Sequence, residues 1–141
     1  MSLTAVRTLF RERLEGLGYE EHPEPFQPNQ IAETLVDRSF HMETGTIVSG
    51  AANQTVHDFE FPITVRVYSK GYDDLLAAYD NAHEIADTIL TDLLDQNVRL
   101  GDPVKDIVPD SVNIEPMDLT NDDILVIVLA FTAKLELCYV T

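Results

Sequence analysis

Four neighbouring side chains in the second half of the chain have residue types that bind metals. They are Asp80, His83, Glu84 and Asp87. Their spacings of three and four residues bring them close together on one surface of a helix. Zinc usually needs further nitrogen or sulfur ligands, and the HExxH pattern is absent. A solvated helix face is therefore the better interpretation, and no metal site is predicted.

Other patterns of catalytic or cofactor chemistry are also absent from the sequence. The run DLTNDD is acidic, but it lacks the residue order of a calcium loop and is typical of a turn. No GxSxG nucleophile motif and no glycine-rich phosphate loop occurs. Cys138 has no activating partner nearby in the sequence and is interpreted as a small buried hydrophobic residue. We therefore predict no catalytic residue and no cofactor, and we expect that the protein is not an enzyme.

Composition narrows the class of protein. The chain has 141 residues, 45% of them hydrophobic, which fits a single folded domain over residues 1–141. The formal charge of −16 argues against general nucleic-acid binding and against docking on anionic lipid. The single cysteine excludes an internal disulfide framework. No stretch reaches about 18 apolar residues, and the N-terminal segment lacks the apolar core of a signal peptide. We expect a soluble, acidic, intracellular protein.

The charge is distributed unevenly. Residues 1–70 carry 6 basic and 10 acidic side chains, whereas residues 71–141 carry 3 basic and 15 acidic ones. The basic side chains of the first half are Arg7, Arg11, Arg13, Arg38, Arg66 and Lys70. In an oligomer they could meet the acidic second half of a neighbouring copy, and the alternative is pairing within the chain or packing of their aliphatic stems.

Two helices are predicted from apolar spacing. The first runs from Leu3 to Leu17, where apolar residues recur every three or four positions. Gly16 and Gly18 can end it, because glycine tolerates the left-handed conformation of a helix C-terminus. The second helix covers about six turns from Asp73, its expected N-cap, to Leu93. It is the clearest element in the sequence.

Four strands are predicted between and after these helices. They lie within Thr34–Glu43, Phe59–Tyr68, Ser111–Met117 and Ile124–Tyr139. The second and fourth show the best alternation of apolar and polar residues. Pro62 lacks a backbone donor, which favours an edge position or a bulge there. Residues 19–30 and 98–110 are rich in proline or aspartate and are expected to be connections.

The element order α-β-β-α-β-β predicts an α+β fold. We expect a mainly antiparallel sheet of about four strands with both helices packed on one face. An open sheet of this size has two edges, which can pair with other chains unless they are blocked. The sequence therefore suggests an oligomer built partly through sheet edges or through the exposed face. The long loop between the first two strands is a further candidate for function.

Several segments together resemble the tail terminator, or tail completion, proteins of long-tailed bacteriophages. They are the glycine-rich loop that ends in Asn53-Gln54, the run from Pro62 to Tyr68, Lys70-Gly71-Tyr72, and the Asn-Asp-Asp turn before the last strand. The resemblance implies a small α+β subunit that assembles into a ring, typically a hexamer. Such a ring caps the tail tube, stops its polymerisation and presents a surface to the head–tail connector. The implied location is the host bacterial cytoplasm during assembly and then the virion tail.

Six residues are the candidate assembly contacts. They are Gly45, Asn53, Gln54, Arg38, Arg66 and Lys70. We expect the loop from Gly45 to Gln54 to order on contact with the tail tube, and Arg66 or Arg38 to form an ion pair between subunits. The alternatives are an acidic monomeric inhibitor that mimics DNA, another neck or head-completion protein of a phage, and a small enzyme with a pocket of perturbed carboxylates.

Overall fold

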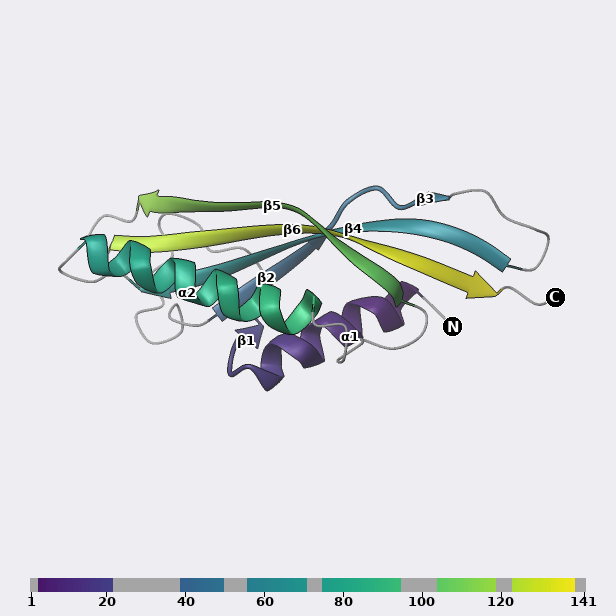
Figure 1. The fold of residues 1–141 in the computed structure, drawn as a ribbon, viewed down its shortest axis with the longest axis horizontal. Coiled ribbons are helices and arrows are strands. Elements are labelled where there is room, and N and C mark those ends of the chain that lie inside the picture. The colour runs from purple at the N-terminus through teal and green to yellow at the C-terminus, as the bar shows by residue number, and fades with distance from the viewer. Residues whose placement is uncertain are drawn as a thin grey trace.

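The chain folds as two helices packed against one sheet, in a computed structural model that describes residues 3–21, 39–49, 56–70, 75–94, 104–118 and 123–138. The elements in order are α1 (Leu3–Gly16), β1 (Glu20–Glu21), β2 (Ser39–Thr44), β3 (Val48–Ser49), β4 (Val56–Lys70), α2 (Leu75–Leu94), β5 (Val104–Asp118) and β6 (Asp123–Cys138). Figure 1 shows both helices against the same face of the sheet. The α+β class predicted from the sequence is confirmed. No helix in the described ranges is long and apolar enough to cross a membrane.

Within the described residues the sheet has six strands, in the order β1-β2-β4-β6-β5, and β3 pairs with β4 beside β2. The four longest strands pair antiparallel, as expected, whereas β1 and β2 are parallel and make the sheet mixed. The expected number of about four strands was low, because two-residue strands such as β1 and β3 are too short to show an alternation of apolar and polar residues.

The core lies between the helices and one face of the sheet. On this face β4 contributes Phe61, Ile63, Val65 and Val67, and β6 contributes Leu125, Ile127, Leu129 and Phe131, all at most 2% exposed. From the helices come Val6, Phe10 and Leu14 of α1 and Ala82, Ile89 and Leu93 of α2. These are residues of the predicted apolar stripes, so the same stripe that predicts each helix also docks it on the sheet.

The end of α1 shows how local sequence sets the chain direction. Gly18 has a φ of 96°, a conformation that favours glycine. The amide of Gly18 donates to the carbonyl of Glu15 at 3.0 Å, and that of Tyr19 to the carbonyl of Leu14 at 3.2 Å. These two bonds form a Schellman motif, which satisfies carbonyls that the helix would leave free. The chain then turns directly into β1.

The structure corrects the sequence prediction for two strands. Residues 104–110 were expected to be a connection but belong to β5, which is 15 residues long. The strand at Pro62 was expected at an edge or a bulge, yet β4 lies between β2 and β6. Pro62 is tolerated because it faces the interruption between β2 and β3, where its carbonyl accepts a hydrogen bond from Gly45 at 3.0 Å. Its missing donor falls in this gap.

Candidate assembly surfaces

Three of the six candidate assembly residues lie outside the described part of the chain. They are Arg38, Asn53 and Gln54. Lys70 ends β4, where its backbone pairs with Ile124. The remaining two, Gly45 and Arg66, both have neighbours that give them a role within the fold.

Gly45 packs against the ring of Pro62. A Cβ at Gly45 would come within 3.2 Å of the Pro62 Cγ atom, which is tighter than an ordinary contact. Together with the bond from the Gly45 amide to the Pro62 carbonyl, this close approach holds the chain where β2 ends and β3 begins. A local structural requirement therefore accounts for a glycine at this position.

Arg66 pairs with an acidic residue of the neighbouring strand. Its Nη1 atom lies 2.7 Å from Glu43 Oε2, and the His41 Nε2 atom lies 3.6 Å from Glu43 Oε1. Nη1 makes no hydrogen bond, so the contact is an ion pair without hydrogen-bond geometry. His41 is 8% exposed and stands directly opposite Arg66. Arg66 thus has a counter-charge inside its own subunit, and its role between subunits stays a prediction.

The arginines of α1 are also paired within the chain. Arg7 and Arg11 contact the two carboxylate oxygens of Glu21 in β1, the first at 3.1 Å. Arg13 donates two hydrogen bonds to Asp92 of α2, at 2.8 and 2.7 Å. Two parallel bonds from one guanidinium give this contact a defined geometry that ties α1 to α2. Of the two interpretations left open for these cations, pairing within the chain is the one observed.

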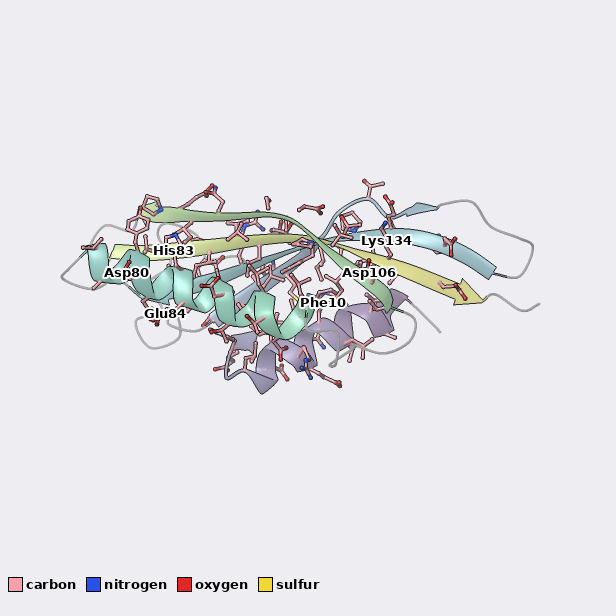
Figure 2. The ribbon with its side chains drawn as sticks, viewed as in Figure 1. Phe10, Asp80, His83, Glu84, Asp106 and Lys134 are labelled. Atoms are coloured by element: carbon pink, nitrogen blue, oxygen red, sulfur yellow. The ribbon has the colours of Figure 1, made fainter. Side chains whose placement is uncertain are left out.

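Lys134 forms no ion pair with the side chains that the structure describes. It lies opposite Glu60 of β4 and opposite Asp106 of β5. Figure 2 labels Lys134 and Asp106 on their adjoining strands. Beyond it, Asp58 and Glu136 stand directly opposite each other, an arrangement of like charges that disfavours pairing of the two strands. This end of the sheet therefore presents net negative charge.

The side of the sheet away from the helices is called the second face here. It is formed by the side chains that alternate with the core along β2, β4, β5 and β6. At one end Ser39, Tyr68 and Val126 are buried, whereas at the other end Glu60, Lys134 and Glu136 are exposed. Between them Thr64, Ala130 and Thr132 are partly exposed. The accessible part of the second face thus carries charged side chains at one end, and small side chains with Val108 and Val128 toward its middle.

A shallow groove lies between the end of α1 and α2. It has a volume of about 420 Å³ and is lined by Leu17, Asp87, Thr88, Thr91 and Asp92. The Thr88 hydroxyl donates to the Glu84 carbonyl at 2.9 Å, and Asp92 is held by Arg13. Two of the polar groups that line the groove, Thr88 and Asp92, are therefore engaged within the fold.

The four side chains considered as metal ligands lie at the surface of α2. Asp80, His83, Glu84 and Asp87 are all exposed, and the first three are labelled in Figure 2. The His83 Nδ1 atom lies 2.7 Å from the Tyr79 carbonyl, so this nitrogen is engaged by the helix backbone. Among the described residues no group of three or more metal-binding side chains is close enough to hold an ion.

Comparison with known proteins adds no relative. No protein-family model matches the chain, and no curated protein sequence matches it. What the protein does must therefore be inferred from its own residues and surfaces.

Proposed function

We propose that this protein is a structural subunit of phage tail assembly, similar to the tail terminator proteins. Copies form a ring, typically a hexamer, that caps the tail tube, ends its polymerisation and offers a surface for joining the head. The supporting observation is the fold itself. An α+β subunit with both helices on one face leaves an outer strand and part of the second face for contacts with other chains. The implied location is the host cytoplasm and then the virion tail.

Contacts in such a ring have physical requirements. Neighbouring copies in a ring meet head to tail, so each copy must use two different surfaces. The ring closes only when the rotation from copy to copy returns to the first one. A stable interface buries on the order of 800 Å² per partner. The accessible part of the second face and the outer surface of the helices lie on opposite sides of the sheet, which suits this kind of contact.

The decisive experiment images the assembly. The purified chain is measured by light scattering and by negative-stain microscopy, alone and with tail tubes assembled from a tube protein of the same phage. We expect rings seated at tube ends and tubes that stop growing when the chain is added. The proposal would be contradicted if the chain, added in several-fold excess over the tube ends, stayed unbound and the tubes kept their length.

The loop from Gly45 to Gln54 can be tested in the same assay, although residues 50–55 lie outside the described part of the chain. Deleting its tip should abolish tube capping and leave the circular dichroism spectrum unchanged. Capping by the deleted form would remove the loop from the proposed contacts.

A second candidate function is supported by the charge distribution. Four arginines, Arg7, Arg11, Arg13 and Arg66, are already paired with carboxylates of the same chain, and the chain as a whole carries a net charge of −16. An acidic inhibitor that mimics DNA has this property and acts as a monomer on a basic host protein. A monomer at all concentrations that binds a basic DNA-binding protein and ignores tail tubes would favour this alternative. Another neck or head-completion role would instead give rings that bind the connector but not the tube.

A further inference from the structure

The outer edge of β5 has backbone groups whose directions follow from two hydrogen bonds. The Pro62 carbonyl accepts from Gly45, so the backbone groups of Pro62 point away from β6. In antiparallel strands, the backbone N–H and C=O groups of two directly opposite residues either point toward each other or both point away. The backbone groups of Thr132, which lies opposite Pro62, therefore point away from β4 and toward β5. The backbone groups of Val108, opposite Thr132 on β5, point back toward β6. Because the direction of the backbone groups alternates along a strand, those of Ile107 and Pro109 point outward, away from β6.

A second bond agrees with this assignment. The Ile107 amide donates to the side chain of Asp106 at 2.9 Å rather than to β6. The register shifts between Pro109 and Ser111. Beyond this shift, the residues whose backbone groups point outward are Val112, Ile114 and Pro116. Within the described residues no strand pairs with this edge.

The edge is blocked on both sides of a short central window. Pro109 and Pro116 have no amide hydrogen, and the amide of Ile107 is already occupied by Asp106. Prolines and bulges are devices by which proteins prevent uncontrolled pairing at sheet edges. Between the two prolines, Val112 and Ile114 keep outward donors and acceptors. We call residues Ser111–Glu115 the β5 window.

The side chains around the β5 window define what can bind. Val112 is 43% exposed and is one of the three large hydrophobic residues that are exposed in the described ranges. Asp110 and Glu115 flank it and are exposed. Their carboxylates accept bonds from neutral groups, Thr132 at 2.6 Å and Asn113 at 2.5 Å, so neither has a counter-charge among the described residues. The window thus combines free backbone groups, one apolar side chain and two unbalanced negative charges.

We propose that the β5 window accepts an extended segment of another protein, which adds as a strand and carries Lys or Arg next to its apolar residues. The backbone of Val112 and Ile114 supplies the hydrogen bonds, and Asp110 and Glu115 select positive charge. The prolines limit the added strand to about five residues, since pairing must stop where no donor is present. A second copy of this chain fits less well, because it would bring the same carboxylates against each other. This inference goes beyond the ring and does not depend on it.

The probe is a capped hexapeptide of alternating lysine and valine, titrated into the isotope-labelled full chain and followed by NMR. We expect saturable shifts of the Val112 and Ile114 amides, with a dissociation constant of about 1 mM or below. Exchange of these two amides with solvent should slow several-fold. A matched peptide with glutamate in place of lysine should bind at least about tenfold more weakly, and added salt should reduce this difference.

Two variants at one position test the backbone role. Val112→Pro removes an outward donor without removing a bond to β6 and should abolish binding. Val112→Thr keeps the donor and should bind within about twofold of the parent chain. If Val112→Pro fails to fold, the comparison of the lysine peptide with the glutamate peptide on the parent chain still tests the proposal. No saturable shift in the window up to about 5 mM peptide, or equal shifts with the glutamate peptide, would overturn the proposal. Concentration-dependent shifts of the window without peptide would assign it to a second copy instead.

Discussion

Replacing Phe10 by alanine tests whether α1 is a structural part of the core. Phe10 is fully buried, and its ring centroid lies 6.5 Å from that of Phe131 on β6, with the planes tilted by 42°. Burying a phenylalanine removes roughly 150–250 Å² from water, which at about 25 cal/mol per Å² is roughly 4–6 kcal/mol. Alanine retains part of this burial, so we expect a loss of about 3–5 kcal/mol, including the cavity that remains.

The loss is large compared with the stability of a domain of this size, which is about 5–15 kcal/mol. Urea unfolding followed by circular dichroism measures it, with Phe10→Leu as a conservative control expected to lose about 1 kcal/mol. Glu12→Ala changes an exposed residue of the same helix and should shift stability by less than about 0.5 kcal/mol. A loss below about 1 kcal/mol for Phe10→Ala would show that α1 does not pack on β6 as described.

Three further predictions concern contacts away from this core. The Arg13–Asp92 pair is partly exposed, and a double-mutant cycle with Arg13→Met and Asp92→Asn should give a coupling free energy of about 0.5–1.5 kcal/mol. The absence of coupling would show that the pair does not join the helices. Gly18→Ala should destabilise by about 1 kcal/mol in a urea titration, and Gly18→Asn by less, because asparagine tolerates a positive φ better; equal effects would contradict the capping role. Arg66→Glu should lower the midpoint of thermal unfolding, and adding Glu43→Arg should restore it; an oligomer that dissociates in Arg66→Glu and does not recover in the swap would assign Arg66 to a subunit contact.

The elements with long amphipathic patterns could be predicted because pattern and packing agree. In α2 the apolar stripe is the buried surface, and along β6 the residues expected to share one face include Leu125, Ile127, Leu129 and Phe131 of the core. β6 pairs with β4 as far as Cys138 and with β5 as far as Leu135. Its first half is apolar on both faces because Val126 on the second face is buried as well as Leu125 and Ile127 on the core face. Local sequence was sufficient here because each residue's environment depends on its own strand or helix.

β5 shows what local sequence cannot reveal. Pro109 was expected in a connection and Pro116 near the end of a short strand, yet both lie in the 15-residue β5, where their missing donors face away from β6. Whether a proline breaks a strand depends on which side of it has a neighbour, and this is a property of the sheet order. The same applies to Pro62, which is interior but faces a gap between two short strands.

The candidate site depends even more on distant contacts. Arg13 and Asp92 are 79 positions apart, and the partners of Arg7 and Arg66 come from neighbouring strands. A count of charges predicts an acidic protein but not which cations are already neutralised. Once these pairs are known, the basic residues that seemed available for a neighbour are largely engaged, and an assembly of copies has few described cations with which to offset its repulsion.

This charge balance distinguishes the two candidate functions by the sign of a salt effect. A ring of subunits that each carry −16 is opposed by repulsion between copies, and salt screens that repulsion over a length that falls from about 10 Å at 0.1 M to about 3 Å at 1 M. Raising the salt concentration should therefore strengthen self-association. Binding of an acidic mimic to a basic protein is driven by attraction and should weaken over the same range. Sedimentation of the chain alone between 0.1 and about 1 M NaCl reports the first effect. Self-association that weakens with salt would mean that unlike charges on neighbouring copies hold them together, contrary to the pairing of cations within each subunit.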